Sequence, residues 1–144
     1  MPRPALAVGI LALIPFPLLL VLMWISPAPF PRASFGSAFL SYGALVLALM
    51  GGAHWALATG PYGRARIAVE WLIGLAALFA AWACIVLPAH LGLSLLIAAF
   101  LLLTLRDALT AEAAGFPLWF ASLRSYVAAA VIVTSVLALV RILI

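Results

Sequence analysis

The sequence predicts an all-α integral membrane protein, built as a single bundle of five transmembrane helices. Of its 144 residues, 69% are hydrophobic and only 7% are charged. The mean hydropathy of +1.39 is too high for a soluble domain of this length, because a small domain leaves much of its surface in water. Five apolar stretches also approach or exceed the roughly 20 residues that a helix needs to cross the hydrocarbon.

Segments rich in proline, glycine and charged residues separate these five stretches. They read SPAPFPRAS after the first stretch, TGPYGRAR after the second, PAH after the third and TAEAAGFP after the fourth. We therefore expect one domain over residues 1–144, with helices over 5–25, 35–58, 67–87, 91–105 and 118–140. The connections are short, so neighbouring helices should be antiparallel.

The first stretch also has the pattern of a secretory signal, because Arg3 precedes an apolar run. It is longer than a typical signal core, and Pro15 and Pro17 interrupt it. Pro29 follows its only candidate cleavage site. These features favour a retained helix.

Arginine placement predicts the orientation of the bundle, because cytoplasmic loops of membrane proteins are enriched in positive charge. The larger group of arginines lies on the side of the amino terminus: Arg3, Arg64, Arg66, Arg106 and Arg124. Arg32 and Arg141 lie on the other side. We therefore expect a cytoplasmic amino terminus and a periplasmic carboxyl terminus. The acidic residues belong to the cytoplasmic side as well: Glu70, Asp107 and Glu112.

A cluster of polar side chains is expected near the cytoplasmic ends of the helices. His54 lies about one turn before the loop at Thr59, within roughly 6 Å of the interface at the rise of an α-helix. Arg124 lies nearly two turns into the last helix and should be paired with a carboxylate, either Asp107 or Glu70. The predicted cluster and its aromatic surroundings comprise His54, Glu70, Asp107, Arg124, Trp55, Trp71 and Trp119.

The same residues also permit a purely structural interpretation. The three tryptophans match the aromatic belt found at membrane interfaces. Glu70 can pair with Arg66 one turn earlier, and Asp107 can face the cytoplasm beside Arg106. In that case the deep arginine snorkels to the interface, and His54 donates one hydrogen bond to a backbone carbonyl.

Small residues predict where helices approach one another closely. His54 shares a helix face with Gly43, Leu47 and Gly51, which would admit another helix or a flat ligand. Rows of small residues predict further contact seams on the second, third and last helices: Ala44, Ala48, Gly52 and Ala56; Ala76, Ala80 and Cys84; Ala121, Ser125 and Ala129.

Several kinds of chemistry are excluded. The arginines are spread singly and form no basic patch, so we expect no nucleic-acid partner. His54 and His90 fall at opposite ends of the predicted bundle, which prevents joint ligation of a metal ion or haem. Cys84 is the only cysteine and is expected to be a small buried residue. With no phosphate-loop, HExxH or GxSxG motif, we expect no catalytic residue, metal or cofactor.

The run YGALVLALMGGAHWAL, with Gly9 and Ile14-Pro15-Phe16 before it and WFASLR opening the last helix, resembles a domain-of-unknown-function family of small membrane proteins. The matching positions are Tyr42, Gly43, Gly51, His54, Trp55, Asp107, Trp119, Leu123 and Arg124. The family resemblance implies five helices and a bacterial inner-membrane home, with relatives in proteobacteria and a mitochondrial transmembrane protein of animals. Ala56 replaces a usual glycine, and the proline expected near Glu70 is missing, so we rank Asp107 above Glu70 as the partner of Arg124.

We expect a non-enzymatic accessory, assembly or stabilising subunit of a larger inner-membrane complex, whose partners are the lipid bilayer and other membrane subunits. The alternative is a binder or carrier of a lipophilic small molecule, a quinone or a lipid, in a cytoplasm-side pocket centred on His54. The residues expected to form this pocket are His54, Asp107, Arg124, Glu70, Trp55, Trp119, Tyr42 and Gly51.

Overall fold

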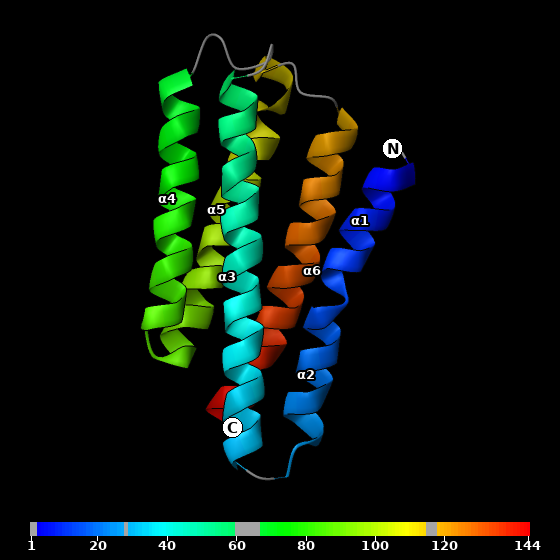
Figure 1. Cartoon of the computed structure of the whole chain (residues 1–144), viewed down its shortest axis with the longest axis vertical. Helices are drawn as coiled ribbons and strands as arrows, with labels where there is room; N and C mark the ends of the chain where they lie inside the picture. Colours follow the sequence, from blue (N-terminus) through cyan, green and yellow to red (C-terminus); the bar gives the residue numbers. More distant parts are fainter. Residues whose placement is uncertain (1–2, 28, 60–66, 115–117) are drawn as a thin grey trace.

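The computed structural model describes residues 3–27, 29–59, 67–114 and 118–144. Within these ranges every regular element is a helix, and the helices lie side by side in one elongated bundle (Figure 1). Their bounds are Arg3–Leu13 (α1), Pro15–Ile25 (α2), Pro29–Thr59 (α3), Ile67–Val86 (α4), Ala89–Ala114 (α5) and Leu118–Leu143 (α6). Because α1 and α2 form one span, five spans in this part of the chain are long and apolar enough to cross a membrane. The predicted all-α class and the five spans are confirmed.

The first span is interrupted at Ile14, between α1 and α2. Pro15 and Pro17 have no backbone N–H, so the regular hydrogen-bond ladder cannot continue through them. The N–H of Ile14 donates instead to the carbonyl of Leu11 at 3.3 Å, which is the tighter three-residue pattern. The chain therefore changes direction within the span, and the two helical segments can follow different neighbours.

Two helices are longer than the sequence predicted. α3 begins at Pro29, where the preset φ of proline suits the first helical position, so the predicted start at residue 35 is six residues late. α5 continues to Ala114 through strong helix formers, beyond the predicted end at residue 105. Asp107 consequently lies inside a helix rather than at its end. Arg64 and Arg66, and the side chain of Glu112, lie outside the described residues.

The buried face of α3 is the one predicted to carry His54. Gly43, Leu47 and Gly51 are buried on it together with His54. A Cβ added to Gly51 would collide with the Cβ of Ala77, so α3 and α4 approach as closely as the missing side chain allows. This close crossing brings the end of α3 against the start of α4.

The predicted seam of small residues on α3 is wrong in its second half. Ala44 is buried, but Gly52 and Ala56 are exposed, and a Cβ added to Gly52 would meet nothing within 4 Å. The reason is that α2, α4 and α5 cover the other sides of α3 and leave this side open along its second half. On α4 and α6 the buried rows are likewise shifted from the predicted ones: Gly74, Ala77, Ala81 and Cys84 on α4, and Ala128, Val131, Ser135 and Ala138 on α6.

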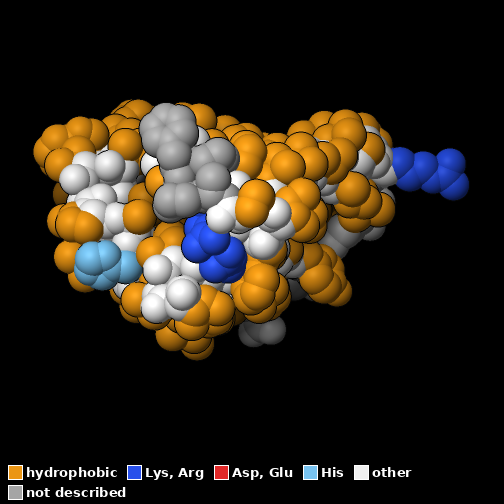
Figure 2. Space-filling model, turned by 90° about the horizontal axis from the view of Figure 1, so that it is seen from below, with side chains coloured by type: hydrophobic (Ala, Val, Ile, Leu, Met, Phe, Trp, Pro, Cys, Tyr) orange, Lys and Arg blue, Asp and Glu red, His pale blue; other side chains and the backbone are white. Residues whose placement is uncertain are grey.

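The two ends of the bundle differ in charge. The described amino-terminal residues lie at the end where α3 finishes and α4 begins, and the carboxyl terminus lies at the opposite end (Figure 1). Viewed from the carboxyl-terminal end, the described surface is mainly hydrophobic, with basic side chains near its middle and no acidic one in sight (Figure 2). Glu70, in the first turn of α4, and Asp107, in the second half of α5, lie toward the end with the amino terminus.

Candidate functional site

The centre of the candidate site is His54, a fully buried side chain near the end of α3. Its Nδ1 lies 2.7 Å from Oε2 of Glu70 on α4. Its Nε2 lies 3.1 Å from Nη2 of Arg124 on α6 and 3.4 Å from Oδ1 of Asp107 on α5. One imidazole thus joins three other helices through charged side chains, and the alternative of a single bond to a backbone carbonyl is wrong.

Arg124 and Asp107 form a buried ion pair. Nε and Nη2 of Arg124 each lie 2.8 Å from Oδ2 of Asp107, and both residues are only 7% exposed. Nη1 of Arg124 donates to the backbone carbonyl of Met50 at 3.0 Å, and the guanidinium carbon lies 5.6 Å from the centre of the Phe120 ring. The predicted partner of Arg124 is therefore confirmed as Asp107, and the alternative of a snorkelling arginine is wrong.

Glu70 pairs with Arg106, a residue that was not included in the predicted cluster. Nη2 of Arg106 donates to Oε1 of Glu70, and Nη1 lies 3.5 Å from Oδ1 of Asp107. The expectation that Asp107 faces the cytoplasm beside Arg106 is wrong, because Asp107 is buried. The alternative pairing of Glu70 with Arg66 lies outside the described residues. A sequence signal for Arg106 did exist, since a buried carboxylate at the depth of Glu70 also needs a cation.

The contacts of His54 define its tautomer. Nδ1 lies closer to Oε2 of Glu70, at 2.7 Å, than to Nη1 of Arg106, at 3.1 Å, and a carboxylate only accepts hydrogen bonds, so we assign the ring proton to Nδ1, which donates to Glu70. A guanidinium only donates, so Nε2 is the acceptor for Arg124. With His54 neutral, the charges of Arg106 and Arg124 balance those of the two carboxylates. We call this set the charge network: His54, Glu70, Arg106, Asp107 and Arg124.

Gly51 and Trp55 belong to the α3–α4 contact rather than to a pocket. Gly51 is buried against Ala77, as described above. Trp55 stacks on Trp71 with ring centres 5.2 Å apart, and its Nε1–H donates to the backbone carbonyl of Trp71 at 3.1 Å. A Cβ added to Gly74 would collide with the Trp55 ring, so this glycine makes room for the indole. Both residues hold α4, and with it Glu70, against α3.

Tyr42, Trp119 and Arg124 line a wide groove between α1, α3 and α6. The groove has a volume of about 1070 Å³, and its walls are almost entirely apolar. Gly9 of α1 packs against Leu123 of α6 at its edge, and the Tyr42 hydroxyl donates to the carbonyl of Ala12 at 2.9 Å. We call it the α1–α3–α6 groove. Its open floor includes Gly52, the position that the sequence analysis expected to be covered.

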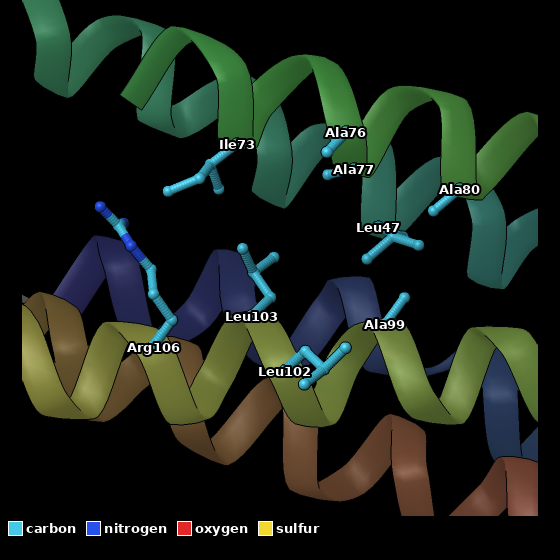
Figure 3. Close-up of a pocket in the computed structure, with 9 residues that line it drawn as sticks. All are labelled: Leu47, Ile73, Ala76, Ala77, Ala80, Ala99, Leu102, Leu103 and Arg106. Carbon is cyan, nitrogen blue, oxygen red and sulfur yellow. The ribbon is translucent and has the colours of Figure 1, made fainter. Parts of the chain in front are cut away.

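A smaller groove of about 260 Å³ lies between α3, α4 and α5, on the other side of the charge network. Alanine, leucine and isoleucine side chains line it, and Arg106 rises at one end from α5 toward α4, near Ile73 (Figure 3). Each arginine of the charge network therefore reaches a different groove, while His54 lies between them and lines neither. The expectation of a pocket centred on His54 is corrected in this respect: the groove is reached through Arg124.

The arrangement can stabilise buried charges and can place a charged hydrogen-bond donor at the wall of a groove. Among the described residues, no three His, Cys, Asp or Glu side chains are grouped so as to hold a metal ion. The two carboxylates are occupied by arginines, and both nitrogens of His54 have charged partners. What Arg124 can offer is an N–H donor at the wall of an apolar groove.

These features define a small multi-pass membrane protein with a buried, internally balanced charge network beside an open apolar groove. Residues 1–140 match the family described as "Protein of unknown function (DUF3429)", and the chain belongs to this family. The match confirms the domain-of-unknown-function family that the motifs suggested. Among curated proteins and among solved structures, nothing matches this chain.

Proposed function

We propose that this protein is a non-enzymatic binder of a lipophilic small molecule, a lipid or a quinone, which it holds in the α1–α3–α6 groove. The observation that carries the proposal is the groove itself, which has about 1070 Å³ of apolar space with Arg124 in its wall. Sites for small molecules between membrane helices combine apolar walls with a few polar groups in the same way. Arg124 binds the polar end of the molecule, and the charge network behind it keeps the guanidinium in position.

The length of the groove supports an acyl or isoprenoid chain as the occupant. Along α3 its lining runs from Tyr42 to Ala53, which spans roughly 16 Å at the rise of an α-helix. Half of a typical hydrocarbon core measures about 15 Å. A single chain from one leaflet therefore fits along the groove, with its headgroup end at Arg124 near the interface.

The experiment fills the groove without touching the charge network. Gly52→Leu adds a side chain where a Cβ meets nothing within 4 Å, so the fold should tolerate it. Ala98→Leu is the matched control, because Ala98 is an exposed helical position on α5 that does not line the groove. Each protein is extracted in polymer nanodiscs, and native mass spectrometry measures the retained lipids and quinones.

We expect the wild type and Ala98→Leu to retain one lipophile and Gly52→Leu to lose it. Equal retention by all three proteins would remove the basis of the proposal. Circular dichroism verifies that the two variants keep their helical content.

An accessory role in a larger membrane complex is a second candidate, favoured by the same open side of α3. Ala48, Gly52 and Ala56 lie four residues apart, and small residues in such a row let a second helix approach closely. Gentle extraction at native expression, followed by native electrophoresis, tests this role. A protein that migrates alone as a monomer rules the accessory role out.

We further propose a bacterial inner-membrane location with the charge network at the cytoplasmic face. In support, Arg3, Arg106 and Arg124 lie toward the amino-terminal end, against Arg32 and Arg141 toward the other. Alkaline phosphatase and green fluorescent protein fused at the carboxyl terminus distinguish the two orientations. Phosphatase activity without fluorescence is expected, and the reverse pattern contradicts the orientation.

A further inference from the structure

We infer that the molecule held in the α1–α3–α6 groove is a lipophilic anion, and that His54 takes up one proton when this anion binds. The inference deepens the proposed function and rests on it. It names the chemical class of the ligand, an acidic headgroup on an apolar chain. It also gives the buried histidine a role at a site that it does not line.

Arg124 has a donor available for the headgroup. A guanidinium carries five N–H groups. Three are accounted for by Asp107 and His54, since Nε–H and one Nη2–H point to Oδ2 of Asp107 and the other Nη2–H donates to Nε2 of His54. A fourth, on Nη1, donates to the carbonyl of Met50. The second N–H of Nη1 is left for a group in the groove that Arg124 lines.

Charge balance couples binding of the anion to uptake of the proton. With His54 neutral, two arginines and two carboxylates sum to zero in the charge network. An anion at Arg124 would add one negative charge in a region of low dielectric constant, which is costly unless a positive charge accompanies it. One proton on His54 restores neutrality. A neutral ligand such as a quinone would need no such proton.

The charge network contains an acceptor for this proton. Oδ1 of Asp107 is buried, accepts no hydrogen bond from the described residues and lies 3.4 Å from Nε2 of His54. A proton arriving from water at Nε2 can therefore be donated to Oδ1. The N–H bond of the imidazolium forms as one O–H bond of a hydronium ion breaks, and no other covalent bond changes.

The charged groups facing His54 come from every helix packed against its ring. Glu70 on α4 accepts from Nδ1, and Asp107 on α5 offers Oδ1, so both favour the proton. Arg106 on α5, at 3.1 Å from Nδ1, and Arg124 on α6 oppose it. The two pairs carry equal and opposite charge, and complete burial of the ring opposes the proton as well, so a positively charged ring needs the added anion.

The test uses lipids that keep their charge at every pH of the experiment. The full-length protein is placed in nanodiscs with brominated phosphatidylglycerol, which is anionic, or brominated phosphatidylcholine, which is zwitterionic. Bromine quenches a nearby indole, and Trp119 lines the groove. Its contribution is obtained by subtracting the fluorescence of Trp119→Phe. Selectivity for phosphatidylglycerol should rise as the pH falls from about 8 to about 5, by up to about tenfold per pH unit for one linked proton.

His54→Gln removes the titrating group while retaining an amide that can donate and accept. We expect its lipid selectivity to be independent of pH. A measurement on the wild type does not depend on this variant folding. In protein labelled with ¹⁵N-histidine, phosphatidylglycerol should convert the ring signals of His54 to the protonated pattern. His90, in the first turn of α5 at the other end of the bundle, should not change.

Each other outcome contradicts a defined part of the reasoning. Equal quenching by both lipids at every pH, with Gly52→Leu still displacing them, overturns the inference and leaves the proposed function intact. No displacement by Gly52→Leu overturns both. Displacement of the lipid by water-soluble glycerol phosphate means that the site binds free phosphate rather than a lipophile, which also overturns the inference.

Discussion

Replacing Asp107 by leucine removes the counter-ion of Arg124, a guanidinium that is 7% exposed. Both nitrogens that face this carboxylate are 2.8 Å from Oδ2, so the whole pairing is lost at once. Removing one partner of a buried pair typically costs about 3–5 kcal/mol in the free energy of unfolding. An unpaired arginine at the centre of a membrane helix costs about 3 kcal/mol on insertion scales, which agrees with the lower end of this range. We therefore expect Asp107→Leu to be destabilised by about 3–5 kcal/mol.

Removing both charges should restore most of the stability. The double variant Asp107→Leu/Arg124→Met leaves Arg106 and Glu70 as a balanced pair and replaces two ions by apolar groups. Such replacements are often neutral or stabilising, so we expect a loss of about 1 kcal/mol or less relative to the wild type. Unfolding in mixed micelles with increasing dodecyl sulfate, followed by circular dichroism, measures the wild type, the single variants Asp107→Leu and Arg124→Met, and the double variant. Additive losses, with the double variant as unstable as the sum of the single ones, would refute the buried pair.

The remaining predictions concern helix contacts and use the same unfolding assay. Gly51→Ala should destabilise by about 1–3 kcal/mol through its collision with Ala77, whereas Gly52→Ala should stabilise by up to about 1 kcal/mol because its Cβ is free; equal effects would contradict the assigned faces of α3. Tyr42→Phe removes the 2.9 Å bond to α1 and should cost about 1 kcal/mol. Trp55→Phe keeps the stacked ring but loses the bond to the α4 carbonyl, with a similar loss of about 1 kcal/mol expected.

The deep arginine shows how far an argument from composition can reach. An ionised group within a membrane span needs a partner, and few candidates exist in a chain with only three acidic residues. Depth along each helix follows directly from residue number at about 1.5 Å per residue. Depth therefore narrowed the partner of Arg124 to Asp107 or Glu70, and the family resemblance then ranked Asp107 first.

Arg106 and Gly52 show where the same reasoning stops. Residue number gives the depth of a side chain but not the direction in which the helix turns that side chain relative to its neighbours. Arg106 was expected at the surface, yet α5 continues past it as a helix and directs it toward Glu70 on α4. Gly52 was expected in a seam, yet no helix covers it.

The amino-acid sequence by itself determined the membrane class, the five spans and the need of Arg124 for Asp107 or Glu70 as its counter-ion. Hydropathy and span length are local properties of the sequence. The cost of an unpaired charge in lipid limits the possible partners because the chain has few charged residues. The tertiary structure alone decided that one histidine joins four charged residues and that the α1–α3–α6 groove stays open beside them. Those features depend on how the packed helices are rotated and how they cross. An alanine-rich chain contains many rows of small residues, and several of them could have formed the helix contacts equally well.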